Sequence, residues 1–185
     1  MDRTLIEAAR SGDEEAFASI ARSSADRLFA VAHRILRDVG RAEDAVQQTL
    51  VTAWRQLPEL REVDRFEAWI HRILVHACYA EAKRERRWSA NVRLLSVDGP
   101  ATPDTTLSVT TRDALDRAFR RLPPEQCAVF VLHYYLDWPL AEIAGSLGVP
   151  LGTVKSRMHY ATTGLRAALE ADARMSTSAS RERLA

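Results

Sequence analysis

Basic side chains interleaved with aromatic rings mark one segment of the sequence, at residues 66–88. Successive spacings of 4, 3, 4 and 3 residues place the members of this stripe on one face of a predicted helix: Arg72, His76, Tyr79, Lys83 and Arg86. Arg84 and Arg87 add charge at its end. Cations bind phosphates and aromatic rings stack on bases, so the stripe suits a nucleic-acid strand with unstacked bases. Considered alone, it also fits a solvated charged face.

A second candidate for nucleic-acid binding lies near the C-terminus, where Gly148-Val149-Pro150 separates two predicted helices. A short helix, a turn and a longer amphipathic helix are typical of a helix-turn-helix. Apolar residues recur in the longer helix at spacings of 4, 3, 4 and 3 and should face the core: Val154, Met158, Ala161, Leu165 and Ala168. The opposite face carries hydroxyls and cations suited to a major groove: Lys155, Ser156, Arg157, His159, Tyr160 and Thr163.

Both candidate surfaces lie on predicted helices. The predicted fold class is all-α, since no alternating strand pattern is present in the sequence. Four helices are predicted in the first half of the chain: residues 4–10, 13–40, 42–57 and 66–88. The second of these has a potential break at Ser23-Ser24, and Gly40 is expected to end it. Four more are predicted in the second half: residues 112–122, 125–136, 140–147 and 151–169.

Composition changes sharply between the two halves. Residues 89–111 are rich in Ser, Thr, Pro, Asp and Gly, which is typical of an extended linker. Fully stretched, some twenty residues reach roughly 70 Å. The prediction is therefore two small helical domains, residues 1–88 and 112–172, joined by this linker and followed by a polar tail at residues 173–185.

Groups that could support catalysis or bind a metal are not clustered. The histidines form no HExxH or related ligand spacing, and neither a glycine-rich phosphate loop nor a nucleophile motif is present. No enzyme activity, cofactor or metal is expected, and Cys78 and Cys127 are expected to be buried thiols. With no signal peptide and no apolar run of bilayer length, a cytoplasmic protein without membrane insertion is expected.

The net charge is only +1. Proteins that bind DNA unaided usually carry a marked basic excess, because phosphate contacts supply much of the affinity. Any DNA binding by this chain is therefore expected to be local, weak or assisted by a partner.

In this order and with this linker, the segments resemble the extracytoplasmic-function (ECF) group of the sigma-70 family. Residues 42–48 are similar to region 2.2, with its Asp-x-x-Gln-Glu/Gln pattern. Residues 66–73 and the basic run 83–87 are similar to regions 2.3 and 2.4. Three further segments are similar to region 4: Leu122-Pro123, residues 140–144 and residues 152–157.

The resemblance implies a promoter-specificity subunit whose partners are the RNA polymerase core, promoter DNA and an anti-sigma factor. It implies docking on the β′ clamp helices through region 2.2, and a second contact with the β flap. The docking residues implied are Asp44, Gln47 and Gln48. Recognition and melting of the −10 element would use the loop 58–65 and the stripe: Arg72, His76, Tyr79, Lys83, Arg84, Arg86 and Arg87. Recognition of the −35 element would use Thr153, Lys155, Ser156, Arg157, His159 and Tyr160.

This sequence departs from the family pattern in places. After Arg157 the family commonly continues with further arginines, which are missing here, and His76 stands where relatives often carry Asn. Two binding alternatives remain: a conventional helix-turn-helix regulator, and an adaptor of the anti-sigma type. The regulator alternative leaves Asp44 and the cationic stripe unexplained. The adaptor alternative is disfavoured because the sequence lacks the His/Cys motif of zinc-type anti-sigma proteins.

Overall fold

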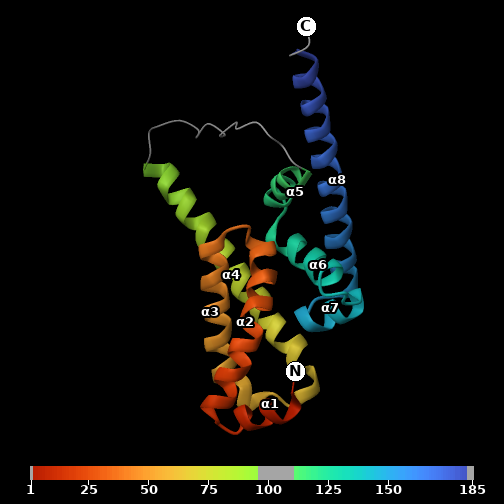
Figure 1. The fold of residues 1–185 in the computed structure, drawn as a ribbon. Helices are drawn as coiled ribbons and strands as arrows, with labels where there is room; N and C mark the ends of the chain where they lie inside the picture. Colours follow the sequence, from red (N-terminus) through yellow and green to blue (C-terminus); the bar gives the residue numbers. More distant parts are fainter. Residues whose placement is uncertain (1, 96–110, 183–185) are drawn as a thin grey trace.

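The computed structural model describes residues 2–95 and 111–182, with side chains described at 2–90 and 114–171. Its regular elements are helical, which confirms the all-α prediction for these segments (Figure 1). The elements are α1 (Arg3–Arg10), α2 (Glu14–Leu36), α3 (Val39–Gln56), the 3₁₀ turns η1 (Leu57–Glu59) and η2 (Val63–Arg65), α4 (Phe66–Leu95), α5 (Thr111–Arg120), α6 (Pro124–Tyr134), α7 (Leu140–Leu147) and α8 (Leu151–Glu182). None of the described helices is long and apolar enough to cross a membrane.

Helices α2, α3 and α4 pack together as the N-terminal domain, and α1 crosses one end of this bundle (Figure 1). Helix α2 is continuous through Ser23-Ser24, where Ser24 is buried. We expected α2 to end at Gly40, but it ends four residues earlier, with Arg37 in the left-handed conformation (φ +55°). Helix α2 ends here because Asp38 begins the next helix. The Asp38 carboxylate accepts a hydrogen bond from the Arg41 N–H at 2.8 Å and so caps the start of α3.

The C-terminal domain consists of α5 to α8. Pro124 lies in the first turn of α6, and Gly148 ends α7 with φ +65°, a conformation that favours glycine. The predicted apolar stripe of α8 faces the core, where Val154 and Ala161 are fully buried. Helix α8 continues to Glu182, so most of the segment predicted as a tail is helical.

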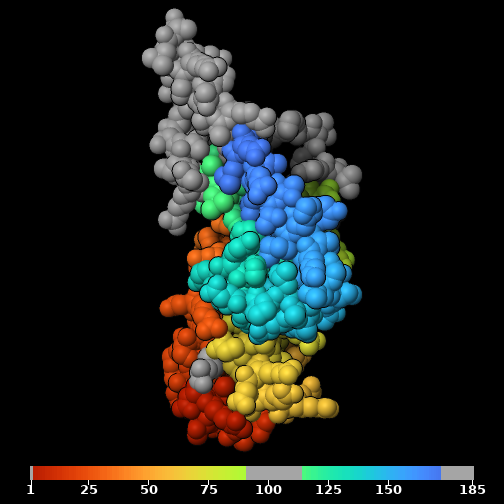
Figure 2. Space-filling view, turned by 90° about the vertical axis from the view of Figure 1, so that its right-hand side faces the viewer, coloured from red at the N-terminus to blue at the C-terminus, as the bar shows by residue number. Residues whose placement is uncertain are grey.

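Helix α4 is longer than predicted, since it ends at Leu95, inside the segment assigned to the linker. The rest of the predicted linker, residues 96–110, lies outside the described residues. The two domains pack directly against each other, through α6 on α2 and α4, and α7 on α4. Figure 2 shows the C-terminal domain, from cyan to blue, lying against the yellow of α4.

Candidate nucleic-acid interface

The predicted stripe on α4 lies on the side of the helix that faces away from its core residues. Ile70 and Leu74, on the core side, are almost completely buried. Most of the stripe is exposed to solvent: Arg72, His76, Lys83, Arg84, Arg86 and Arg87. The structure thus presents six of its seven predicted members to a strand approaching from outside.

Tyr79 is the exception, because it lies at the border between the two domains. Its side chain is half-buried, and its hydroxyl oxygen is inaccessible to solvent, with no hydrogen-bond partner among the described residues. Burial raises the pKa of this phenol, and the charge of Arg157 on α8 acts in the opposite direction.

His76 and the buried His71 have different environments on the same helix. The His76 ring meets the Tyr79 ring edge-on, with 6.3 Å between centroids. Partial burial and the charge of Arg72 lower the pKa of His76, which favours a neutral ring near pH 7. His71 is 1% exposed, and its Nδ1 donates a hydrogen bond to the Glu67 carbonyl oxygen at 2.8 Å. His71 is therefore structural, and His76 is free to contact a ligand.

The predicted docking residues share the exposed face of α3. Asp44, Gln47 and Gln48 are all exposed, while Val46 on the other side of the helix is buried. The Asp44 carboxylate accepts a hydrogen bond from Arg84 of α4 at 2.9 Å. The docking face and the cationic stripe are thus adjacent surfaces, and one ion pair joins them.

The predicted −35 residues lie along the first half of α8. Four of them are exposed: Lys155, Ser156, His159 and Tyr160. Thr153 and Arg157 are half-buried, and the Ser156 hydroxyl donates to the Thr153 carbonyl oxygen at 2.9 Å. The exposed members form a continuous polar surface on a helix whose other side is packed into the domain.

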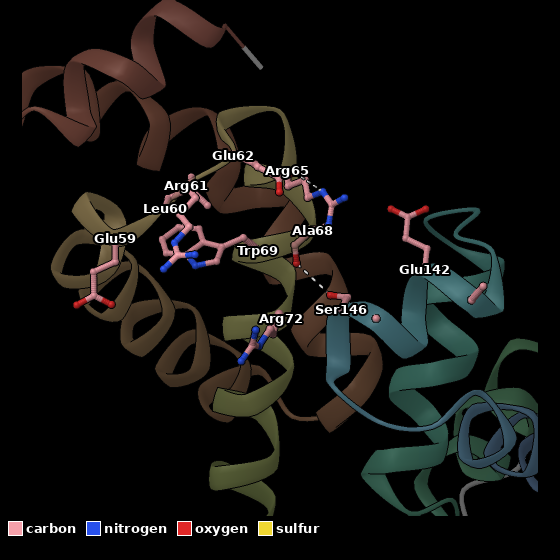
Figure 3. A pocket seen from close by; sticks show the side chains of 12 residues that line it. Glu59, Leu60, Arg61, Glu62, Arg65, Ala68, Trp69, Arg72, Glu142 and Ser146 are labelled. Carbon is pink, nitrogen blue, oxygen red and sulfur yellow. Dashed lines mark hydrogen bonds and ion pairs between the residues drawn. The ribbon is translucent and has the colours of Figure 1, made fainter.

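A hollow of about 650 Å³ lies between the loop that precedes α4, the start of α4, and α7 (Figure 3). Its lining includes three arginines and one indole: Arg61, Arg65, Arg72 and Trp69. The sequence indicated the loop at residues 58–65 but gave no sign that Trp69 would line the hollow. It also gave no signal that α7 would form the opposite wall, with Glu142 and Ser146.

Cys78 and Cys127 are both free and buried, as the sequence predicted. Burial raises the pKa of their thiols, to about 12 and about 11 respectively. Within the described residues, no group of three His, Cys, Asp or Glu side chains is arranged to bind a metal ion.

Comparison with known proteins matches both domains to one family. The family model for sigma-70 region 2 matches residues 20–88, and that for sigma-70 region 4 matches residues 112–161. The ECF RNA polymerase sigma factor SigL of Mycobacterium tuberculosis is 35% identical over 170 residues, covering 86% of this chain and 94% of SigL. SigW of Bacillus subtilis, also an ECF sigma factor, is 25% identical over 178 residues, covering 90% and 95% of the two chains.

Two solved structures share the fold. CnrH, in complex with the cytosolic domain of CnrY, has a TM-score of 0.64 and 26% identity, covering 92% of this chain and 98% of CnrH. The sigma factor RpoE of Bartonella quintana, in complex with the anti-sigma factor NepR, has a TM-score of 0.65 and 22% identity, covering 84% and 98%. With both family models matched in order and relatives similar over nearly their full length, this chain belongs to the ECF group of the sigma-70 family of RNA polymerase sigma factors.

Proposed function

We propose that this sigma factor directs promoter-specific initiation through three separate surfaces. The helices up to the end of α4 would form a melting and docking unit, and the helices from α5 onwards would form a duplex-binding unit. The exposed face of α3 docks on the polymerase, α4 and the loop before it bind the −10 element, and α8 binds the −35 element. The strongest support is the hollow beside the stripe on α4.

This hollow has the chemistry that an extruded base requires. Trp69 offers an aromatic face for stacking, and Arg61 and Arg72 offer cations for phosphates, while Arg65 is already paired with Glu62 at 2.7 Å. Glu59 and Glu142 also line the hollow and partly offset its positive charge. Its volume lies within the range of small-molecule sites, which suits one nucleotide. Unstacking a base costs a few kcal/mol, so a site that binds the extruded base favours the melted strand. Arg72 belongs both to the hollow and to the stripe, which makes the two surfaces continuous.

Duplex binding by α8 follows helix-turn-helix geometry. The N-terminal part of the second helix contacts base edges in proteins of this kind, and here that part carries Thr153, Lys155 and Ser156. Only Lys155 and Arg157 supply charge at this point, which predicts weak binding to duplex DNA by the free chain.

A protein inhibitor is the remaining proposed partner. The relatives CnrH and RpoE were each solved with a second protein bound, an anti-sigma factor in the case of RpoE. A partner of this kind fits a chain whose two DNA-binding surfaces lie on separate domains, because covering both would prevent initiation. We therefore propose an anti-sigma factor for this chain.

Run-off transcription with core polymerase and a library of promoter fragments tests the assignment. Replacing Asp44 and Gln47 by Ala removes a carboxylate and an amide from the docking face without touching the core of α3. We expect specific transcripts from the wild type and their loss in this double variant. The matched control is Asp26→Asn, which neutralises an exposed carboxylate on α2 and should leave the transcripts unchanged.

The conventional-regulator alternative predicts a different outcome. No binding to core polymerase, together with tight duplex binding by the protein alone, would contradict the sigma-factor assignment. Loss of transcription in the Asp26 control as well would show that the docking residues have no special role.

A further inference from the structure

A small cavity of about 30 Å³ lies between α2 and α4. Its apolar lining includes Leu28 and Ile70, both almost completely buried in the core of the N-terminal domain. Two buried polar side chains also line it, Ser24 of α2 and His71 of α4. The cavity therefore has polar groups inside the packed contact between two helices.

The imidazole of His71 supplies a hydrogen-bond acceptor at this contact. Its Nδ1 bonds to the Glu67 carbonyl oxygen at 2.8 Å. Because a carbonyl oxygen can only accept, the proton of the neutral ring lies on Nδ1, and Nε2 carries a lone pair. This Nε2 is inaccessible to solvent and has no hydrogen-bond partner among the described residues. The ring is also held edge-on by Trp138, with 5.6 Å between centroids, so it is fixed on two sides.

The hydroxyl of Ser24 is in the same situation on the facing helix. Ser24 is 7% exposed, and its Oγ is inaccessible to solvent without a partner among the described residues. Serine and threonine inside helices often donate to a carbonyl one turn earlier, as Ser23 does to Ile20 at 3.0 Å and Thr49 does to Ala45 at 2.6 Å. Ser24 makes no such bond, so its hydroxyl is available to the cavity as donor and acceptor.

One water molecule satisfies both atoms. It donates a hydrogen bond to His71 Nε2 and accepts one from the Ser24 hydroxyl. Glu67 also lines the cavity and can accept the second proton of the water, although its Oε2 is already bound by Arg27 at 2.6 Å. A bound water needs a cavity of at least about 10–15 Å³ and two to four polar partners. This cavity meets both requirements and is too small for an organic ligand.

We propose that a structural water molecule binds in this cavity and bridges Ser24 of α2 to His71 of α4. The bridge holds the first turns of α4 against α2. Trp69 and Arg72 line the hollow from the same turns (Figure 3). The water site follows from the contact between α2 and α4 and does not rest on the proposed function.

Ser24→Ala separates a bridged hydroxyl from an unpaired one by the sign of its effect on stability. If the water is bound, alanine removes one of its partners, and the unfolding equilibrium constant should rise about 3- to 10-fold. If the hydroxyl is unpaired, alanine removes a buried polar group and stabilises the chain. Ser19→Ala is the matched control for the higher helix propensity of alanine, because Ser19 is a half-buried residue of α2 outside the cavity. Urea unfolding of the full-length variants measures the difference.

Nuclear magnetic resonance on the full-length wild type tests the water directly. We expect the ¹⁵N shifts of the His71 ring to show a proton on Nδ1 only. Water-selected Overhauser spectra should show a cross-peak between the His71 ring and water, with the sign of a long-lived bound molecule. A Ser24→Ala protein more stable than the Ser19 control, or a proton on Nε2, would overturn the bridge. A destabilised Ser24→Ala protein without the water cross-peak would also overturn it, because the hydroxyl would then bond to a protein group instead.

Discussion

Replacing Tyr79 by Phe tests whether burial of the Tyr79 hydroxyl destabilises the folded chain. The oxygen is inaccessible to solvent and has no hydrogen-bond partner among the described residues, although the ring packs against its surroundings. In the unfolded chain the same hydroxyl is hydrated. Folding therefore costs the desolvation of this group without a compensating bond, and Tyr79→Phe removes that cost while it keeps the ring.

The expected gain follows from the price of an unpaired buried hydroxyl, about 1–3 kcal/mol. We expect the lower end, about 1 kcal/mol, because Tyr79 is only half-buried as a residue. With a urea dependence of about 1–3 kcal/mol/M for small proteins, the midpoint should rise by roughly 0.3–1 M.

Urea unfolding followed by circular dichroism measures this shift, with an unchanged slope as evidence that only stability has changed. Tyr160→Phe is the control, since the Tyr160 side chain is 60% exposed and its hydroxyl remains hydrated. We expect less than about 0.5 kcal/mol for this variant. A Tyr79→Phe protein that is less stable than the wild type would refute the reasoning, because the hydroxyl would then have a partner in the folded chain.

Three further changes probe the packing, capping and titration of the fold. Gly164→Val should destabilise the C-terminal domain by about 1 kcal/mol in urea unfolding, because a Cβ at this site would lie 2.9 Å from Leu122 Cδ2 and the Leu122 side chain must shift; equal stability would show that Leu122 moves aside without cost. Asp13→Ala should cost about 1 kcal/mol by the same assay, since its carboxylate caps α2 by accepting the Ala16 N–H at 3.0 Å; Asp13→Asn serves as the control. Burial lowers the pKa of His71 in the folded chain. As the pH falls through about 6.5, the unfolded chain therefore binds more protons than the folded chain. The free energy of unfolding should then fall by up to about 1.4 kcal/mol per pH unit. His71→Gln should reduce this loss between about pH 7.5 and pH 5.5, and an unchanged slope would show that other groups cause it.

Much of the fold could be predicted because core positions repeat with the period of a helix. Val154, Ala161 and Leu165 on α8 are buried as that period requires. The end of α2 was misplaced because glycine was given more weight than the Asp38 cap. Asp is a preferred residue at the start of a helix, and Asp38 begins α3, so Gly40 lies in the first turn of α3 and does not end α2.

The interdomain contact could not be predicted by the same means. Arg34 and Arg37 are of a residue type that is mostly exposed, and Trp138 lies in the loop between α6 and α7, so helical spacing carries no sign of a partner for them. A contact between residues some 80 positions apart also depends on the relative placement of two domains, which local periodicity does not determine. Only the structure shows that Arg37 pairs with Asp116 and that Arg34 lies over the Tyr135 ring, both in the second domain.

Intramolecular ion pairs further reduce the DNA affinity expected of a chain whose net charge is only +1. Arg84 of the stripe is paired with Asp44 at 2.9 Å and with Glu81 at 2.8 Å. A phosphate that binds Arg84 must compete with these carboxylates, so the free energy gained from DNA is smaller than the number of arginines suggests. If Asp44 instead docks on the polymerase, as proposed, that contact releases Arg84 at the moment when DNA is to be bound. Docking on the polymerase and affinity for DNA are then coupled through the Arg84–Asp44 ion pair. We therefore expect Asp44→Asn to strengthen binding of single-stranded DNA by the free chain, although the same change weakens binding to the polymerase.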